Sequence, residues 1–391
     1  MTIDDISELF VLSIARSSKH FRQLEKDRLI AKTLIQVLSK DGYLSIIYHV
    51  TVFFDDNSSF SFVLKRPSTA RYIEAFCLDI EKDDLNFLSL VHNRECQVYD
   101  IFKDQISIAP RIYGAKQIVE VAKDTGYLMM ESLVGRAGVL GMFGQITDKL
   151  CLNMANQLGK FKAEMAEVPL ESYAHLSDPF RLESDLLYNL MIDHTPTLVE
   201  YDYKVFFPLT QKLKPFVNKK SFAYLIKTRA EELGVESLIH GDLHGGNLML
   251  ILQSDGTLSN EIAAIIDWQL SFCGNPLFDL ARFLSCADPD IRRRVEKAAI
   301  DEYFNAYLRH VEYPNPRFTR EVCQELYDLS TVLQALEWQN FFGILTGNLN
   351  VSKSELEAIK ARTALKCRFC MEDSLLLIEK YKLHEKIDSS L

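Results

Sequence analysis

The sequence lacks any apolar run approaching the roughly eighteen residues that a membrane-spanning helix requires. Its first residues, MTIDDISELF, are acidic where a secretory signal would be basic. We therefore expect a cytoplasmic protein without a membrane span.

Basic residues are also in short supply. Lys and Arg number 44 against 54 Asp and Glu, which gives a formal charge of -10. Nucleic-acid binding depends on clustered Lys and Arg, so this balance predicts no nucleic-acid partner. The one dense basic run, Arg292 to Arg294, is flanked by Asp288, Asp290 and Glu296. We interpret that run as a solvated helix face.

The eight cysteines follow no disulfide framework, which fits reduced thiols in a cytosolic protein. Cys367 and Cys370 have CxxC spacing, but they lie inside a long helical pattern. No second CxxC completes a zinc site. We expect two buried thiols on one helix face.

The hydrophobic periodicity changes character near residue 132. Before it, we predict two leading helices and a small antiparallel sheet with a further helix packed against it. The two leading helices lie within 4–39 and the further helix over 87–102. The strands are predicted over 43–54, 60–66, 116–122 and 127–130. After it, we predict mainly long amphipathic helices, over 145–168, 216–233, 289–311, 320–345 and 355–383. The fold class is therefore α+β, with an N-terminal lobe over 1–132 and a helical C-terminal lobe over 133–391.

The residues with the clearest chemistry lie in LIHGDLHGGNLML (238–250) and AAIIDWQ (263–269). The first stretch reads as a strand, a tight polar loop and a second strand, and the second as a strand that ends at Asp267. Asp242, Asn247 and Asp267 supply two carboxylates and a carboxamide. The offset between Asp242 and Asn247 is that of the protein-kinase catalytic loop, which precedes a metal-binding Asp. These are the groups that phosphoryl transfer needs.

The N-terminal lobe offers residues for holding a nucleotide. Lys65, at the end of FVLKRP, is placed to contact phosphates, and Glu95 is its favoured partner on the following helix, with Glu74, Glu81 and Asp84 as competitors. Gly42 and Ser45 are candidates for phosphate contact in the turn before the first strand of the hairpin. Backbone groups near Glu131 and Leu133 are candidates for adenine contact, although a buried strand edge is an equal reading.

These motifs, together with GNPLFDLARFL (274–284) and HNRECQVY (92–99), resemble the CHK kinase-like proteins. That group comprises ecdysteroid-kinase-like proteins and nematode relatives within the aminoglycoside phosphotransferase and choline kinase superfamily. The resemblance covers nearly the whole chain. It implies a protein-kinase-like two-lobe fold and ATP-dependent phosphorylation of a small-molecule hydroxyl.

The resemblance also implies roles for single residues. Asp242 would be the catalytic base, Asn247 and Asp267 the Mg2+ ligands, and Lys65 the phosphate-contacting lysine paired with Glu95. His240 would be structural. From the residues alone, we expect His244 to be solvent-exposed rather than to face substrate, and Asp279 to tie the catalytic loop rather than to do chemistry.

Two departures and two alternatives accompany this reading. The turn at Gly42 is poor in glycine, and the short segment from Asp267 to Asp279 leaves no room for a protein-kinase activation loop. A nucleotide-binding pseudokinase is the first alternative and a protein kinase the second. The acceptor could be steroid-, glycoside- or choline-like. Trp338, Phe341 and Phe342 either line its pocket or pack in the core.

Overall fold

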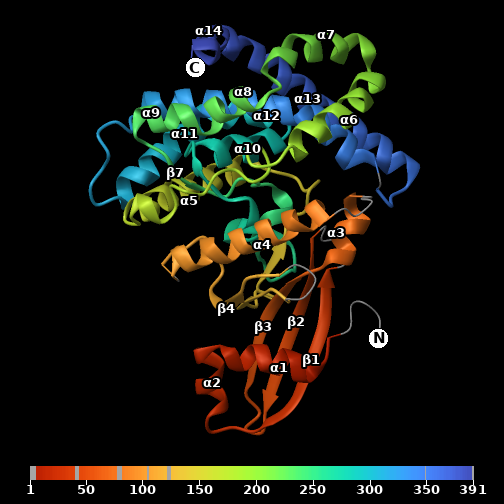
Figure 1. Cartoon of the computed structure of the whole chain (residues 1–391), viewed down its shortest axis with the longest axis vertical. Coiled ribbons are helices and arrows are strands. Elements are labelled where there is room, and N and C mark those ends of the chain that lie inside the picture. Colours follow the sequence, from red (N-terminus) through yellow and green to blue (C-terminus); the bar gives the residue numbers. More distant parts are fainter. Residues whose placement is uncertain are drawn as a thin grey trace. The chain divides into compact units, whose positions relative to one another are not determined.

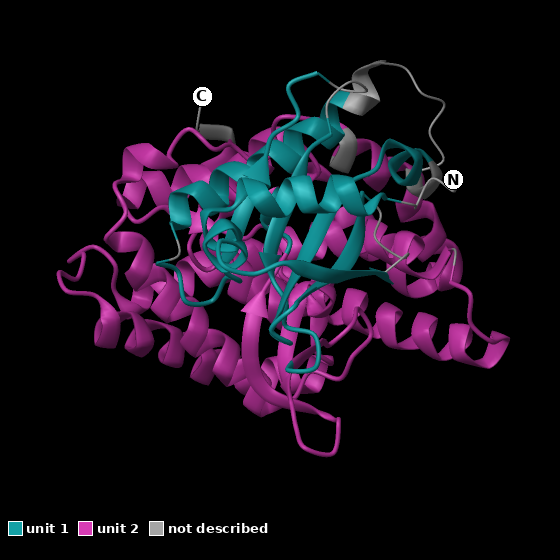
Figure 2. Cartoon of the chain, turned by 90° about the horizontal axis from the view of Figure 1, so that it is seen from below, with its two compact units in different colours: residues 1–136, 267–269 teal, residues 137–266, 270–391 magenta. Residues whose placement is uncertain are grey.

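The structure is a computed structural model that describes residues 6–39, 44–76, 82–103, 105–120, 125–347 and 349–389. It divides into two compact units, coloured separately in Figure 2. The first unit comprises Met1–Arg136 with Asp267–Gln269, and the second comprises Ala137–Ile266 with Leu270–Leu391. The predicted α+β class, with an antiparallel sheet in the N-terminal part and helices in the C-terminal part, is confirmed.

The first unit is built on an antiparallel sheet with strand order β1-β2-β3-β5-β4. Its strands are β1 (Ile30–Ser39), β2 (Ser45–Phe54), β3 (Ser59–Pro67), β4 (Ile112–Lys116) and β5 (Tyr127–Glu131). Its helices are α1 (Glu8–Ser17), α2 (Lys19–Glu25), α3 (Thr69–Phe76) and α4 (Lys82–Phe102). The predicted hairpin is confirmed as β2 and β3, with residue 43 outside the described residues, and the helix predicted over 87–102 is confirmed as part of α4.

Two predicted elements of this unit are wrong. Residues 30–39 were assigned to a helix, but they form β1 and pair with β2. The β-branched Ile30, Thr33, Ile35 and Val37 favour a strand, and pairing with a neighbouring strand outweighs the weak helical spacing. Of the strand predicted over 116–122, residues 121 and 122 lie outside the described residues. The described strand lies earlier, as β4, because Ile112–Lys116 is the segment that pairs with β5.

Side-chain alternation along the strands separates the two faces of this sheet. The apolar residues Phe60, Phe62 and Leu64 of β3 point into a core closed by α1 and α2, and Figure 1 shows α1 lying across β1, β2 and β3. Because successive side chains on a strand point to opposite faces, Lys65 lies on the other face. That face is where α4 supplies a partner for Lys65.

The second unit is mainly helical. Its helices are α5 (Asp148–Ala166), α6 (Leu186–Tyr201), α7 (Tyr203–Leu213), α8 (Lys219–Ala223), α9 (Arg229–Leu233), α10 (Phe278–Cys286), α11 (Pro289–His310), α12 (Arg320–Gly347), α13 (Lys353–Tyr381) and α14 (Leu383–Ser389). A π-helical segment, η3 (Tyr224–Thr228), joins α8 to α9. Short 3-10 turns are η1 (Leu170–Ser172), η2 (Lys214–Phe216), η4 (Gly245–Asn247) and η5 (Trp268–Leu270), the last beginning in residues of the first unit.

Two small sheets of the second unit hold the polar loop at residues 240–247 in place. β7 (Ser237–Ile239) pairs with β10 (Phe272–Gly274), while β6 (Ala137–Val139), β8 (Leu248–Leu252) and β9 (Leu258–Ile265) form the second sheet. The loop from His240 to Asn247 therefore begins at one sheet and ends at the other. Helix α12 packs against α6, α10 and α13 and is buried along most of its length, which makes it the central helix of this unit.

Local sequence signals explain several helix ends. Helix α13 begins with a capping box, in which Ser352 accepts from the backbone N–H of Glu355 and Glu355 accepts from that of Ser352. Helix α11 starts at Pro289, which suits the first turn because proline has no N–H to satisfy. Helix α9 ends at Gly234 in the left-handed conformation.

Three further sequence predictions meet the structure here. The thiols of Cys367 and Cys370 are buried on α13, as predicted, and donate to carbonyls of α12. The prediction of a solvated face is wrong for Arg292, which is buried and pairs with Asp373. Within the described ranges, the helices include none with the length and apolar character that crossing a membrane would take.

Candidate active site

The first unit contains a buried cluster of Lys65, Glu95 and Asp267. The predicted ion pair between Lys65 and Glu95 is present, with 2.6 Å between Nζ and Oε2, and Glu95 is completely buried. Lys65 Nζ also donates to Asp267 Oδ1. One ammonium therefore serves two carboxylates, and the cluster has a net negative charge when Glu95 is ionised.

This sharing shifts the pKa values of both members of the ion pair. Burial raises the pKa of Glu95 to about 7, since the opposing effect of Lys65 is partly cancelled by the nearby Asp267 carboxylate. Burial alone would lower the pKa of Lys65, but Asp267 and Glu95 together raise it above its usual value. Lys65 therefore stays charged at neutral pH.

Asp267 is held in place by its neighbours in the chain. Its φ of 68° lies in the left-handed region, which non-glycine residues seldom occupy and which often marks functional sites. The next residue, Trp268, is fully buried, and its ring packs edge-on against Phe102 of α4 at 4.8 Å. Gln269 Nε2 lies 3.3 Å from Asp267 Oδ2. Trp268 thus anchors the segment that carries Asp267 to the helix that carries Glu95.

In the second unit, the loop after β7 is tied down by Asp279 from the first turn of α10. The Asp279 carboxylate accepts from the backbone N–H of His240 at 2.7 Å and of Gly241 at 3.0 Å, which confirms its predicted role in tying the loop. Gly241 has a φ of 85°, and a Cβ there would lie 2.2 Å from the Leu270 carbonyl oxygen. Only glycine fits both conditions.

His240 links this loop to the end of β9. Its Nδ1 accepts from the backbone N–H of Asp242 at 3.2 Å, so the proton of a neutral ring lies on Nε2 and is donated to the Ile266 carbonyl at 2.9 Å. Ile266 immediately precedes Asp267 in the chain. The contacts are those of a structural residue.

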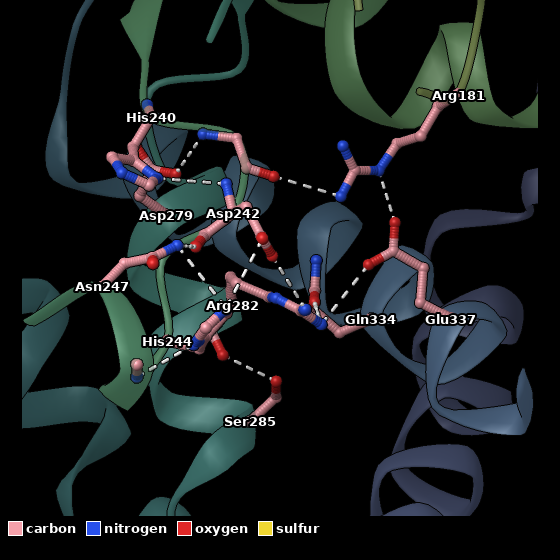
Figure 3. A network of polar contacts seen from close by, with 12 residues as sticks. Arg181, His240, Asp242, His244, Asn247, Asp279, Arg282, Ser285, Gln334 and Glu337 are labelled. Atoms are coloured by element: carbon pink, nitrogen blue, oxygen red, sulfur yellow. Dashed lines mark hydrogen bonds and ion pairs between the residues drawn. The ribbon is translucent and has the colours of Figure 1, made fainter. Parts of the chain in front are cut away.

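Asp242 has a partner on each carboxylate oxygen (Figure 3). Oδ1 accepts from Arg282 Nη2 at 3.1 Å, and Oδ2 lies 3.4 Å from His244 Nε2. Although burial opposes it, His244, then Arg282 and His240, hold the pKa of Asp242 well below its usual range. Asp242 is therefore ionised across the physiological range.

The expectation that His244 is solvent-exposed is wrong. Only 13% of its side chain is exposed, because its Nδ1 accepts from the backbone N–H of Gly246 at 3.0 Å and its Nε2 faces Asp242. The ring therefore caps the short turn η4 and fixes one side of the Asp242 carboxylate.

The side-chain nitrogen of Asn247 makes a hydrogen bond within the loop, whereas its side-chain oxygen makes none among the described residues. Its Nδ2 donates to the Asp242 carbonyl at 3.0 Å, and its backbone carbonyl accepts from Ile266 at 3.0 Å. Within the described residues, its Oδ1 accepts no hydrogen bond. An amide whose nitrogen is fixed in this way presents its oxygen as a ligand for a hard cation.

The predicted nucleotide-contacting residues of the first unit lie at strand ends. Ser45 is buried at the start of β2, opposite Pro67, while Gly42 lies outside the described residues. The Glu131 N–H donates to the Arg111 carbonyl, and its side chain accepts from the Arg111 N–H at 3.1 Å. The Leu133 carbonyl accepts from the Arg136 N–H.

The aromatic residues predicted on α12 have different surroundings. Phe342 is buried, with its ring 5.0 Å from that of Tyr201, which is a core position. Trp338 is also buried and packs edge-on against Phe341. Phe341 is half-buried, and the Arg282 guanidinium lies 4.3 Å from its ring centroid.

Sequence reasoning missed the cations next to Asp242. Arg181 donates to the Gly241 carbonyl at 3.2 Å and pairs with Asp178 and Glu337, and Arg282 follows Asp279 by one helical turn. The i,i+3 spacing of Asp279 and Arg282 places both on one face of α10, so the DLAR stretch could have identified Arg282. Arg181 and Glu337 are too far apart in the chain for any local pattern to pair them.

Comparisons with known proteins bear on these observations. The profile of the DUF1679 family, described as "Uncharacterized oxidoreductase dhs-27", matches residues 75–383. A Caenorhabditis elegans protein of that description is 27% identical over an alignment of 286 positions, which covers 68% of this chain and 34% of the relative. The matched region thus spans about a third of that relative.

Several solved structures are similar at low identity. They include an amicoumacin kinase in complex with AMP-PNP, Ca2+ and Ami (TM-score 0.46, 13% identity, 93% of each chain). They also include a GDP and kanamycin complex of APH(2")-IIia (0.44, 13%, 96% of this chain and 99% of that one) and a macrolide 2'-phosphotransferase from Brachybacterium faecium (0.42, 14%, 92% and 98%). Similarity at this level does not assign a function.

Proposed function

The chain belongs to the DUF1679 family, and we propose that it is a phosphotransferase that moves the γ-phosphoryl group of ATP to a hydroxyl of a small molecule. The observation that carries this proposal is the arrangement of chemical groups in each unit. The first unit holds a buried lysine shared by two carboxylates, and the second holds an ionised Asp242 with an Asn247 oxygen nearby on the same loop. Phosphoryl transfer requires these groups.

Each residue has a task in this proposal. Lys65 would contact the phosphates, and Glu95 would keep the Lys65 side chain in place, since an ammonium buried to this degree needs a partner. Asp242 would accept a hydrogen bond from the attacking hydroxyl. Because its pKa is so low, orienting that hydroxyl is a larger part of its role than drawing off a proton early in the reaction.

The oxygen donors of Asp267 and Asn247 are of the kind that Mg2+ prefers. Asp267 and Asn247 would hold it, because Mg2+ is commonly bound by one or two protein oxygens together with phosphates and water. When bound, the ion would neutralise charge on the phosphates. The Asn247 oxygen that has no partner among the described residues supports this assignment, as does the left-handed backbone at Asp267.

The first unit would hold the nucleotide. Ser45 and Gly42 would contact phosphates, and the connecting strand end at Glu131 and Leu133 would contact the adenine through its backbone. Since the Glu131 N–H and the Leu133 carbonyl are already bonded, the Leu133 N–H is the group that we propose for the base.

The word oxidoreductase in the relative's description suggests a second activity, but the features of this chain favour phosphotransfer. Dinucleotide-binding folds use a parallel sheet and a G-x-G-x-x-G turn. The described strands pair antiparallel, and the printed sequence contains no such turn. The matched part covers 34% of that relative, so the description applies to a much longer protein.

Thermal unfolding with nucleotide and metal tests the proposal. ATP with Mg2+ should raise the unfolding temperature more than ATP alone, and Asp267→Ala should remove the metal-dependent part. A shift that does not depend on Mg2+ would favour the pseudokinase alternative. Phosphorylation of peptide libraries would favour a protein kinase instead.

A further inference from the structure

Charged side chains of alternating sign run from Asp178 to Asp242 in the second unit, and all but Asp242 are buried. Figure 3 shows the part from Arg181 to Asp242. Asp178 Oδ2 lies 2.8 Å from Arg181 Nη1, and Arg181 Nε donates to Glu337 Oε1. Glu337 Oε2 lies 3.6 Å from Arg282 Nη1, and Arg282 Nη2 lies 3.1 Å from Asp242 Oδ1. We call this series the charge chain. It ends at the residue that orients the acceptor hydroxyl in the proposed function.

Arg282 has little freedom within the charge chain. Besides Asp242 and Glu337, its Nη1 donates to Gln334 Oε1 at 3.3 Å, and its guanidinium stacks on Phe341. Only 6% of its side chain is exposed, against 26% for Asp242. Asp242 is therefore the more exposed member of this pair.

The acidic oxygens around Arg282 are already engaged. Asp242 meets Arg282 and His244, Glu337 meets Arg181 and Arg282, and both Asp279 oxygens accept backbone N–H groups. Each of these carboxylates therefore already has a cationic or N–H partner, although Glu337 Oε2 has only the ion-pair contact and no hydrogen bond among the described residues.

Three nitrogen donors in and around Arg282 also have no hydrogen-bond partner among the described residues. Among the described residues, Arg282 Nε, Gln334 Nε2 and Trp338 Nε1 are buried without a hydrogen-bond partner. The orientation of the Gln334 amide is physically determined, because an arginine only donates and so must face the amide oxygen. Gln334, Trp338 and Phe341 recur at i, i+4 and i+7 and lie on one face of α12. Buried donors of this kind need an acceptor.

We propose that Arg282 is a specificity-determining residue for the acceptor, and that the site takes alcohols with an oxygen acceptor beside the reacting hydroxyl. That oxygen belongs to a second hydroxyl, a carbonyl or a carboxylate, and amino alcohols are disfavoured. Glu337 is a positioning residue that acts through Arg282. The inference rests on the proposed role of Asp242 in orienting the hydroxyl.

The geometry gives the reason for this preference. Because Arg282 Nη2 lies 3.1 Å from Asp242 Oδ1, a hydroxyl bound to Asp242 lies beside the guanidinium. A group on the neighbouring carbon then meets N–H donors. An oxygen accepts from them, whereas an ammonium adds a like charge and offers no lone pair.

Matched pairs of alcohols that differ beside one hydroxyl test the inference. Ethylene glycol with ethanolamine and glycerol with 2-amino-1,3-propanediol are such pairs, and ADP release with Mg2+ and ATP gives kcat/KM for each. We expect the oxygen member to be favoured at least tenfold. Arg282→Met should lower kcat/KM for that member at least 100-fold and abolish the preference, while Arg282→Lys should keep part of it.

The positioning role of Glu337 has its own readout. Glu337→Gln keeps the size of the side chain but weakens its hold on Arg282, so KM for the oxygen member should rise with a smaller change in kcat. Arg309→Met is the matched control, since Arg309 is exposed and pairs only with Glu302 among the described residues. It should leave both constants unchanged.

The outcomes separate the inference from the proposed function. A preference for the ammonium member, an unchanged preference in Arg282→Met, or use of no pair by the wild-type protein would each overturn the acceptor class. A Mg2+-dependent stabilisation by ATP in the same preparation keeps the proposed function in those cases. The same measurement on Arg282→Met shows whether that variant is folded.

Discussion

The Lys65 ammonium lies 2.6 Å from the Glu95 carboxylate, although one residue is on strand β3 and the other on helix α4. Lys65 is 7% exposed and Glu95 is completely buried. A charge removed from water in this way is tolerated only with its partner. The pair therefore couples the sheet of the first unit to its long helix, and Asp267 competes for the same ammonium.

Lys65→Met should destabilise the protein strongly, because it leaves Glu95 and Asp267 without their cation. Breaking a buried pair from one side costs about 3–5 kcal/mol, and the free energy of unfolding in urea measures it. The double variant Lys65→Met with Glu95→Leu should recover part of the loss, since it removes the buried charge as well. A single variant that costs less than about 1 kcal/mol would contradict a coupled pair.

The raised pKa of Glu95 predicts a pH dependence of stability. In the unfolded chain the group titrates near 4.5, and in the folded protein near 7, so the folded state binds the proton more tightly between these values. Stability from this group is therefore greatest below about 4.5 and falls as the pH rises towards 7. Urea unfolding at several pH values should show this slope for the wild-type protein.

The slope should disappear in Glu95→Gln, which cannot titrate. Glu261→Gln, at an exposed position of β9, should retain it. A slope of equal size in Glu95→Gln would mean that another group is responsible.

The strand β3 and helix α4 illustrate what the sequence could predict. FVLKRP has the β-branched and aromatic composition of a strand, and Glu95 falls within an apolar helical stripe, so the pairing with Lys65 could be predicted. The segment Ile30–Ser39 could not, because its helical spacing was accidental and its structure depends on pairing with β2. Pairing with β2, which the local sequence of Ile30–Ser39 does not encode, determines that this segment is a strand.

The conformation of Gly241 predicts a costly alanine substitution. Gly241→Ala places a Cβ 2.2 Å from the Leu270 carbonyl oxygen and requires a left-handed alanine. Gly256→Ala is the matched control, because Gly256 has a φ of 82° but open space around it. The control should lose about 1–2 kcal/mol from backbone strain alone.

Gly241→Ala should lose a further ~1–3 kcal/mol from the steric overlap, measured by urea unfolding of both variants. Equal losses in the two variants would show that Leu270 moves aside without cost. In that case the close approach would not define the loop.

Asp242→Asn should lower ADP release with an accepted alcohol by about 100- to 10,000-fold, the range seen when a positioned acid or base is removed. Its unfolding free energy should change little by comparison, because the amide retains an oxygen for Arg282. Asp255→Asn, in an exposed turn, is the control and should keep full activity. Unchanged activity in Asp242→Asn would remove this residue from the mechanism.

The candidate site was predictable where a residue type and a short spacing coincide. Asp242, Asn247 and Asp279 lie within or close to one loop and its anchoring helix, and their contacts follow from that proximity. His244 was misjudged because its contact with Asp242 depends on the tight turn η4, which brings the ring back over the loop. Arg181 and Glu337 come together only through the packing of α12, which no local pattern encodes.

Transfer of label from ATP tests the central claim most directly. The protein is incubated with γ-labelled ATP, Mg2+ and a mixture of small hydroxyl compounds, and the small-molecule and protein fractions are separated. We predict label in a small-molecule phosphate ester with the wild-type protein and loss of that ester with Asp242→Asn. Label found only in inorganic phosphate or in protein, or an equal yield of ester from both proteins, would contradict a small-molecule phosphotransferase that works through Asp242.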